Sequence, residues 1–225
     1  MRTDFHSEKE KHNYFARMSE EQKLDAFGGI LADSEHVVFL GGAGVSTERG
    51  IPDFRSKNGL YHKSEKRFSK YRPEYLLSYD CLNKEPEVFF DYYRRNLDAR
   101  EVEPNMAHIV LAEMEACGRL DGVITQNIDG LDQKAGSQNV QEIHGTIWKN
   151  HCVSCGKVYD ENCIFDSEES VPHCAECGKM VRPNVTLYGE FLPEEAYQNA
   201  ISMLQFADCL IIAGSVPYKR LFLQR

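Results

Sequence analysis

The sequence contains no hydrophobic run that approaches the about 18 residues of a membrane-spanning helix. An excess of basic residues is missing as well, because 26 Lys and Arg stand against 35 Asp and Glu, for a net charge of −9. A nucleic-acid-binding surface needs the opposite balance, so we expect neither a nucleic-acid nor a membrane partner. Residues 1–17 are polar and charged and lack the apolar core of a signal peptide. These absences favour a cytoplasmic protein.

Internal repeats and low-complexity linkers are also absent, and the 225 residues are enough to bury a complete core. Short apolar runs alternate with longer amphipathic segments. This alternation predicts an α/β fold with a Rossmann-like, doubly wound parallel sheet that binds ligands at the carboxyl ends of its strands. The expected strands are 36–40, 121–125, 140–143 and 208–213. The expected helices are 20–32, 73–79, 84–98, 105–117 and 193–206.

One segment, 148–182, interrupts the alternation and looks too polar to contribute strands to a sheet. We therefore expect a small inserted domain there, within one domain that spans residues 1–225. Its large Rossmann-like part would comprise residues 20–147 and 183–215, with a helical insert at about 56–103. Residues 216–225 form an atypical tail.

Two Cys-x-x-Cys pairs lie within this inserted segment, Cys152/Cys155 and Cys174/Cys177. Their separation falls within the spacing typical of structural zinc sites. Each pair directs two thiolates at one point, and two pairs complete a tetrahedron with no open position for water, so the zinc would hold structure and perform no chemistry. Two disulfides or four unrelated thiols are the alternative.

A glycine-rich loop, Gly42-Ala43-Gly44, directly follows the first expected strand. Glycines there let backbone N–H groups approach a pyrophosphate closely, although Thr47 replaces the third glycine of the dinucleotide-binding pattern. Further on, Phe54 stands between Asp53 and Arg55. A ring beside an arginine suits a cofactor with a flat heterocycle and phosphates, and a solvated loop with one Phe turned inward is the equal alternative.

Six motifs occur together in one order: 42–46 (GAGVS), 50–55 (GIPDFR), 125–129 (TQNID), His144-Gly145, the four cysteines, and 182–190 (RPNVTLYGE). In this order the chain resembles the sirtuins, the NAD-dependent protein lysine deacylases, and in particular their compact bacterial members. The resemblance extends from about residue 24 to 214. It implies a Rossmann-like domain, a small domain with one structural Zn²⁺, and an acetylated lysine-containing protein substrate bound between them. It leaves the oligomeric state open.

The resemblance also implies residue roles in a reaction that consumes NAD and transfers an acetyl group to ADP-ribose. His144 would be the general base that deprotonates a ribose hydroxyl, which suits an imidazole at neutral pH, and Asn127 would act with it. Asp129 would bind the nicotinamide amide, and Phe54 would shield the pocket. The positions implied to contact NAD are Gly42, Ala43, Gly44, Thr47, Asp53, Phe54, Arg55, Gln126, Asn127, Ile128, Asp129, Gly214 and Ser215.

The segment 185–190 resembles the one that pairs with the substrate peptide as an added strand, a mode of binding that tolerates many sequences. The implied peptide positions are Val185, Leu187, Tyr188, Gly189 and Glu190. Tyr92 and Arg95 resemble the pair that binds acidic acyl groups in desuccinylase-type sirtuins, with a shift of one residue. We expect a deacetylase, with a desuccinylase as the alternative.

Three departures from the family pattern stand out. Asp132 replaces a histidine after the 125–129 motif, which we expect to be peripheral to the chemistry, and Arg49 replaces a small residue and should face solvent. After Gly214 the chain lacks the family's adenosine-binding elements, which indicates a truncated or frameshifted reading frame. A remnant that binds zinc and peptide without catalysis, and a mono-ADP-ribosyltransferase, are therefore further alternatives.

Overall fold

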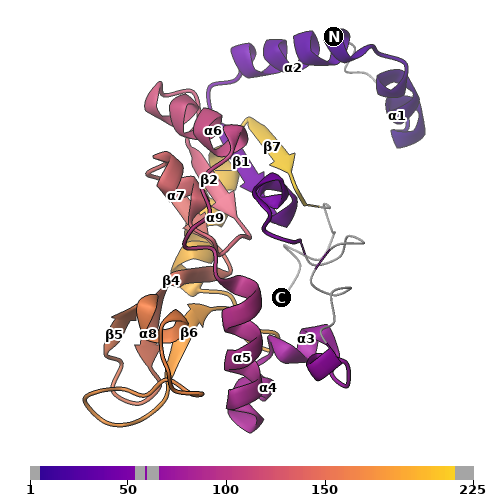
Figure 1. Cartoon of the computed structure of the whole chain (residues 1–225). Helices are drawn as coiled ribbons and strands as arrows, with labels where there is room; N and C mark the ends of the chain where they lie inside the picture. Colours follow the sequence, from indigo (N-terminus) through magenta and orange to yellow (C-terminus); the bar gives the residue numbers. More distant parts are fainter. Residues whose placement is uncertain (1–5, 54–58, 60–65, 216–225) are drawn as a thin grey trace.

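The computed structural model describes residues 6–53, 59 and 66–215 (Figure 1). Phe54 and Arg55, two of the expected cofactor residues, lie outside these residues, and so does the tail at 216–225. Within the described part, the chain forms a parallel sheet with helices and a second part that contains an antiparallel sheet.

A four-stranded parallel sheet is the centre of the larger part, with the strand order β3-β2-β1-β7. The four expected strands are confirmed within one residue at their ends. Their bounds are β1 Val37–Gly41, β2 Gly122–Thr125, β3 Val140–Glu142 and β7 Cys209–Ala213. β1 is buried along its whole length, as expected for a parallel strand that helices cover on both faces.

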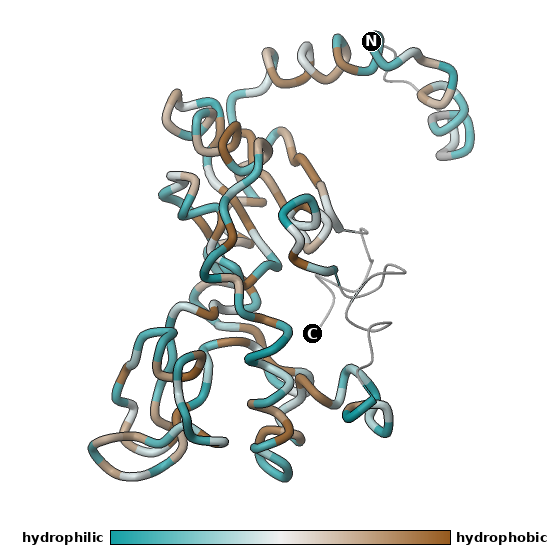
Figure 2. The backbone as a smooth tube through the Cα atoms, viewed as in Figure 1, coloured by the Kyte–Doolittle hydropathy of each residue, from teal (hydrophilic) through white to brown (hydrophobic). Residues whose placement is uncertain are grey.

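Alternate residues of β1 face two different layers of helices. Phe39 packs with Leu111 of α6, whereas Leu40 packs on the other face with Ala200 of α9. The helices that cover the sheet are α6 Met106–Ala116 and α9 Glu194–Phe206, whereas α2 Glu20–Asp33 has no buried residue and extends away from the sheet (Figure 1). Hydrophobic residues recur along the strands that these helices cover (Figure 2). The doubly wound α/β fold is thereby confirmed.

The segment around the cysteines does contain a sheet, so the expectation that it is too polar for strands was wrong. Three antiparallel strands pair in the order β5-β4-β6. They are β4 Gly145–Cys152, β5 Val158–Asp160 and β6 Val181–Val185. In β4 the side chain of Ile147 is buried while Lys149 is exposed. An antiparallel sheet can leave one face in water, so polar residues did not exclude strands.

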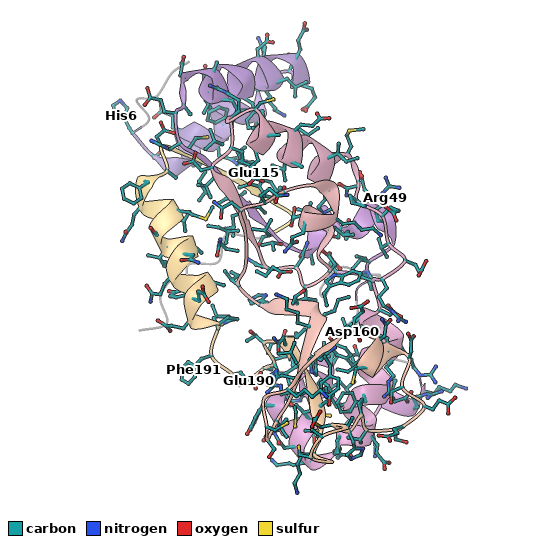
Figure 3. All side chains as sticks on the ribbon, turned by 90° about the vertical axis from the view of Figure 1, so that its left-hand side faces the viewer. His6, Arg49, Glu115, Asp160, Glu190 and Phe191 are labelled. Carbon is teal, nitrogen blue, oxygen red and sulfur yellow. The ribbon has the colours of Figure 1, made fainter. Side chains whose placement is uncertain are left out.

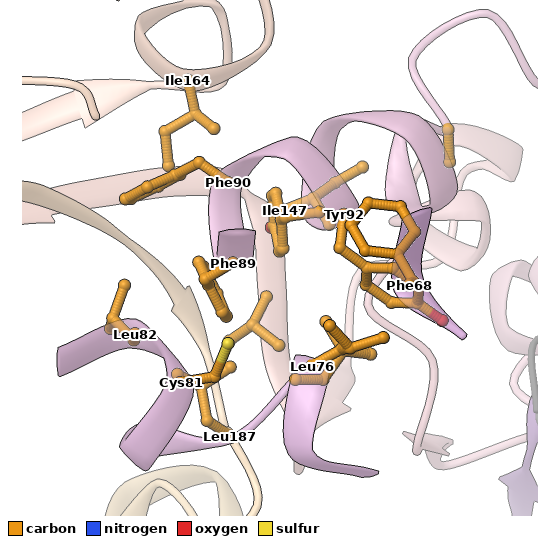
Figure 4. Packing of buried hydrophobic residues seen from close by; sticks show 14 residues of the cluster. Phe68, Leu76, Cys81, Leu82, Phe89, Phe90, Tyr92, Ile147, Ile164 and Leu187 are labelled. Carbon is orange, nitrogen blue, oxygen red and sulfur yellow. The ribbon is translucent and has the colours of Figure 1, made fainter. Parts of the chain in front are cut away.

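Short helices pack against this second sheet. They are α3 Pro73–Leu76, α4 Tyr79–Lys84, α5 Pro86–Leu97 and α8 Asn162–Phe165. The expected helix 73–79 ends early, because Ser78 caps a new helix by accepting a hydrogen bond from the Cys81 N–H (3.0 Å). Phe89 and Phe90 of α5 meet Ile147 and Ile164 in one core (Figure 4). The helical insert and the cysteine-bearing segment thus share a single hydrophobic cluster.

Arg94 near the end of α5 and Arg100 just beyond it strengthen this contact. The Arg94 guanidinium donates to the carbonyls of Ile164 (2.7 Å) and Glu169 (2.8 Å). Arg100 forms ion pairs with Asp98 (2.9 Å) and Asp166 (2.8 Å). Because these bonds join α5 to the segment between the two cysteine pairs, the two modules are held as one unit.

The remaining described elements are α1 Glu8–Ala16, α7 Leu131–Ala135, and the 3-10 turns η1 Ala43–Val45, η2 Thr47–Arg49 and η3 Lys66–Phe68. The sequence patterns did not predict α1 or α7. In Figure 1, α1 lies beyond α2, away from the parallel sheet. Among the helices of the described residues, none combines the length and the hydropathy needed to cross a bilayer.

Candidate active site and metal centre

The glycine-rich loop after β1 lies against the end of β7. The Gly42 N–H donates to the Ala213 carbonyl (3.1 Å), and the Gly44 N–H donates to the Gly214 carbonyl (2.9 Å). A Cβ atom on Gly42 would lie 2.7 Å from the Gly214 carbonyl oxygen, and a Cβ atom on Gly44 would lie 2.7 Å from the Gly214 Cα. The glycines therefore allow a close approach of two backbones, and the structure brings these three expected cofactor residues together.

The two 3-10 turns η1 and η2 continue from this loop. Ala43 opens η1 and Thr47 opens η2, and the Thr47 hydroxyl donates to the Gly44 carbonyl (3.0 Å). Arg49 at the end of η2 is exposed, as expected. Asp53, at the end of the described stretch, is half-buried.

A buried polar cluster joins the loop after β1 to the loop after β2. The Ser46 hydroxyl donates to Asp129 Oδ2 (2.8 Å) and accepts a hydrogen bond from Asn127 Nδ2 (3.1 Å). Ser46 is fully buried and Asp129 is 5% exposed. Ser46 was not among the expected site residues, although its place directly after the glycine loop was a usable signal. The cluster presents an amide and a carboxylate at the carboxyl ends of two parallel strands, where ligands bind in this fold.

Gln126 connects this cluster to Ser215, which follows β7, and to His144, which precedes β4. Its side-chain amide donates to the Ser215 hydroxyl (3.3 Å), and its backbone carbonyl faces His144 Nδ1 at 2.9 Å. Ile128 accepts a hydrogen bond from the Ile147 N–H (3.0 Å). The expected residues of the 125–129 motif and Ser215 therefore lie around one loop.

The imidazole of His144 has a defined orientation. Because a carbonyl oxygen only accepts, the bond from Nδ1 to Gln126 leaves Nε2 unprotonated in the neutral ring. Burial lowers the pKa of His144, and the Gln126 carbonyl partly opposes this effect. The following Gly145 has a φ of 76°, in the region that favours glycine. The neutral ring therefore presents its unprotonated Nε2 as a proton acceptor.

Two residues that the sequence analysis missed support the same loops. The Asn105 side chain caps α6 by accepting from the Ala107 N–H (2.9 Å), and its amide donates to the Val45 carbonyl (2.6 Å). His108 is fully buried, accepts from the Asn105 N–H (3.2 Å), and has its pKa lowered by burial. An Asn followed three residues later by a His at a helix start was the available signal.

The four cysteines form one cluster in the second part of the structure. Their sulfur atoms all lie within 4.8 Å of one another, with Cys152–Cys177 at 3.3 Å and Cys155–Cys174 at 3.6 Å. A tetrahedral zinc site with Zn–S bonds of about 2.3 Å separates its sulfurs by about 3.8 Å. The four thiols are not joined as disulfides, and their convergence on one point fits Zn²⁺ better than the disulfide alternative.

Each cysteine pair has the same local geometry. Gly156 and Gly178 follow the pairs with φ of 73° and 68°, and their N–H groups donate back to Cys152 (3.1 Å) and Cys174 (2.8 Å). The Tyr159 hydroxyl donates to Cys174 Sγ (3.1 Å) and lowers the pKa of that thiol to about 6. These turns direct both thiols of a pair at one point.

The residues expected to contact the substrate peptide differ in how far their side chains are exposed to solvent. Val185 and Leu187 are 8% and 3% exposed and pack in the core, whereas Tyr188 is 47% exposed. Gly189 has a φ of 94°. The Glu190 carboxylate accepts two hydrogen bonds from Arg182 (2.5 and 2.8 Å). Glu190 therefore helps to hold this loop in place.

A groove of about 910 Å³ runs along this segment, between β4, β6 and the start of α9. Tyr79, Gly189 and Phe191 are among its lining residues. Phe191 is 95% exposed and projects from the loop beside Glu190 (Figure 3).

The sequence matches the Sir2 family over residues 42–217. The chain belongs to the Sir2 family. A protein of Clostridium acetobutylicum named NAD-dependent protein deacetylase is 46% identical over 193 residues, which cover 86% of this chain and 78% of that protein. A Clostridium perfringens protein of the same name is 46% identical over 195 residues, covering 87% and 79%.

Solved Sir2 structures have the same fold. One, described as Sir2 with a deacetylated p53 peptide and 3'-O-acetyl ADP-ribose, has a TM-score of 0.77 and 35% identity, covering 84% of this chain and 75% of that one. Another, described as Sir2 with a p53 peptide and NAD⁺, has a TM-score of 0.74 and 35% identity, covering 84% and 74%.

Within this Sir2 chain, the pair Tyr92 and Arg95 does not form an exposed anion site. Tyr92 is 4% exposed and packs edge-on against Phe68, with ring centroids 5.1 Å apart. Arg95 Nε donates to Asp91 on the same helix (2.7 Å). The desuccinylase alternative therefore gains no support from the geometry.

Asp132 departs from the family pattern and lies closer to the site than expected. It is 4% exposed in the second position of α7. Burial and the neighbouring carboxylates of Asp129 and Glu142 raise the pKa of Asp132 to about 7. Burial also raises the pKa of Glu142. A group with this pKa changes its charge as the pH passes through neutrality.

Proposed function

We propose that this protein is an NAD-dependent protein lysine deacetylase, which cleaves nicotinamide from NAD and transfers the acetyl group of acetyl-lysine to ADP-ribose. The observation that carries the proposal is the buried Ser46–Asn127–Asp129 cluster beside His144. It occurs in a chain whose Sir2 relatives are named for this activity. Solved relatives with peptide and NAD or acetyl ADP-ribose support both substrates.

NAD would be held where the loops after β1, β2 and β7 meet. The donor set fits: Asn127 and Asp129 offer an amide and a carboxylate, and Gln126 with Ser215 extends the polar surface. Bound NAD supplies an electrophilic ribose carbon and a nicotinamide leaving group. Asp129 would accept a hydrogen bond from the nicotinamide amide, and Ser46 keeps its carboxylate oriented toward that position.

His144 would act as the general base at Nε2. Its Nδ1–H stays bound to the Gln126 carbonyl, so the ring cannot rotate away while it accepts a proton from a ribose hydroxyl. A pKa lowered by burial keeps the imidazole neutral above the acidic range. Correct protonation at working pH is what general-base catalysis requires.

The substrate peptide would pair with the backbone beside the groove. Within this segment the N–H groups of Thr186 and Tyr188 already donate to the carbonyls of His144 (2.9 Å) and Leu77 (3.0 Å). The Leu187 N–H donates to the Glu190 carboxylate (2.9 Å). We therefore assign peptide pairing to the Thr186 carbonyl and to the backbone of Gly189, where sequence-tolerant strand addition is possible.

One Zn²⁺ bound by Cys152, Cys155, Cys174 and Cys177 would be structural. Four thiolates close the tetrahedron and leave no site for water. The segment that carries the cysteines shares one hydrophobic core with α5 and with β6, which borders the groove. By stabilising that segment, the metal would therefore stabilise the groove as well. The proposal includes a cytoplasmic location and no nucleic-acid partner, on the acidic composition.

Nicotinamide release measured with and without an acetyl-lysine peptide tests the proposal. Release that requires the peptide supports it, whereas release with transfer of labelled ADP-ribose to protein indicates ADP-ribosylation. His144→Ala should reduce the rate by about 10²–10⁴. His173→Ala is the matched control, because that ring is exposed and pairs with Glu169. Equal rates for His144→Ala and the parent would contradict the assignment.

A further inference from the structure

The hydroxyl of Tyr159 joins the two cysteine pairs. Tyr159 belongs to β5, which follows the first pair, and its hydroxyl donates to Sγ of Cys174 in the second pair (3.1 Å). The same oxygen accepts a hydrogen bond from the Ala175 N–H (3.0 Å). One side chain from the strand after the first pair therefore contacts both a thiol and the backbone of the second pair.

The Tyr159 ring is held in this position by its neighbours. It packs with Cys174 and Val181 in a small hydrophobic cluster. The Lys157 ammonium lies 5.5 Å from the centroid of the ring and pairs with Glu176, which stands between the two cysteines of the second pair (2.7 Å). Both partners of this ion pair are exposed, so it adds little free energy. The hydroxyl of Tyr159 is the group that reaches a metal ligand.

Hydrogen bonds to the sulfur atoms matter for a centre of this composition. Four thiolates exceed the charge of one Zn²⁺, so the loaded centre is anionic. A hydrogen bond donated to a thiolate offsets part of this charge and is stronger than one between neutral groups. The backbone N–H groups of Ser154 and Cys155 point at Cys152 Sγ at 3.4 and 3.5 Å. Cys174 receives the shorter bond from a side chain, which a substitution can remove.

We propose that Tyr159 is a positioning residue of the zinc site, whose hydroxyl holds the Cys174 sulfur where the four thiols converge and thereby increases the affinity for Zn²⁺. The inference rests on the structural zinc of the proposed function and adds a residue outside the four cysteines. A sulfur that is already oriented needs less ordering when the metal binds. Partners that hold a metal ligand in this way typically contribute about 10–100-fold to metal affinity.

The zinc affinity of the full chain with Tyr159→Phe tests the inference. Phe keeps the ring and its packing and removes only the hydroxyl, and the exposed Ala175 N–H can bond to water instead. The dissociation constant for Zn²⁺, measured under reducing conditions by competition with a chromogenic chelator, should rise about 10–100-fold. Tyr93→Phe is the matched control, because the hydroxyl of Tyr93 is fully buried and has no hydrogen-bond partner among the described residues. It should keep the dissociation constant of the parent.

Cobalt separates a role at the metal from a general effect on folding. With Co²⁺ in place of Zn²⁺, the thiolate-to-cobalt charge-transfer band should move to longer wavelength in Tyr159→Phe, because a sulfur that has lost a hydrogen bond gives up electron density more readily. A change in fold stability alone does not move this band.

Three results overturn this inference alone: an unchanged zinc dissociation constant in Tyr159→Phe, an equal change in Tyr93→Phe, or a changed constant with an unmoved cobalt band. A parent chain that binds no zinc overturns the zinc site of the proposed function as well.

Discussion

Replacing Asp132 with Asn should stabilise the protein, and by more at alkaline than at acidic pH. In the folded chain the pKa of Asp132 is raised from 3.8 to about 7. The folded state therefore binds more protons than the unfolded state between these two values. Under proton linkage, stability then falls as the pH rises through this window and becomes constant above it. Asn at this position has no charge to bury and does not share this loss.

The magnitude follows from the same shift. A pKa difference of about 3 units, at 1.36 kcal/mol per unit, corresponds to about 4 kcal/mol at full ionisation. For a chain of this length, 1 kcal/mol moves the melting temperature by about 2–4 °C. We therefore expect Asp132→Asn to melt close to the parent at pH 4 and about 10 °C higher at pH 8.

Thermal unfolding followed by circular dichroism at several pH values between 4 and 8 checks this expectation. Asp25→Asn is the control, because Asp25 is exposed on α2 and its replacement should leave the pH dependence unchanged. The lowered pKa values of His108 and His144 oppose stability at acidic pH, but they act equally in the parent and the variant. A stability difference that is the same at pH 4 and pH 8, or that shrinks as the pH rises, would refute the reasoning.

Three further outcomes are expected. The Cys155→Ala variant should lose one equivalent of zinc and, with it, a share of the about 10 kcal/mol that a structural zinc contributes to folding. The control variant Cys163→Ala should keep the metal. Elemental analysis and melting curves check both outcomes. The Gly44→Ala variant should weaken NAD binding and lower the melting temperature, because the new Cβ would lie 2.7 Å from the Cα of Gly214. In the control variant Gly28→Ala the new Cβ meets nothing within 4 Å. This variant should stabilise α2 by about 0.5–1 kcal/mol. Glu190→Gln should raise KM for the acetylated peptide severalfold with NAD affinity unchanged, since its carboxylate orders the loop beside the groove; unchanged peptide kinetics would show that the loop needs no such support.

The sequence by itself determined the features that depend on local pattern. The alternation of short strands and helices predicted the four strands of the parallel sheet within one residue at their ends, and β1 and β2 are buried along their whole length, as expected for strands covered on both faces. The spacing of the cysteine pairs predicted the cluster of four thiols, because each pair closes within a few residues. The order of six short motifs was sufficient to place the chain in the Sir2 family, which the family match confirmed.

Only the tertiary structure decided the features that depend on distant neighbours. Ser46 bonds to Asn127 and Asp129 across 81 and 83 residues, which no local pattern records. The strands of the cysteine-bearing segment escaped prediction because their exposed faces are polar, and pairing across β4, β5 and β6 satisfies their backbones. Asp132 looked peripheral because its pKa reflects burial and the approach of Asp129 and Glu142 from other elements. Desolvation and charge proximity are properties of the folded chain, and a residue's place in the sequence does not reveal them.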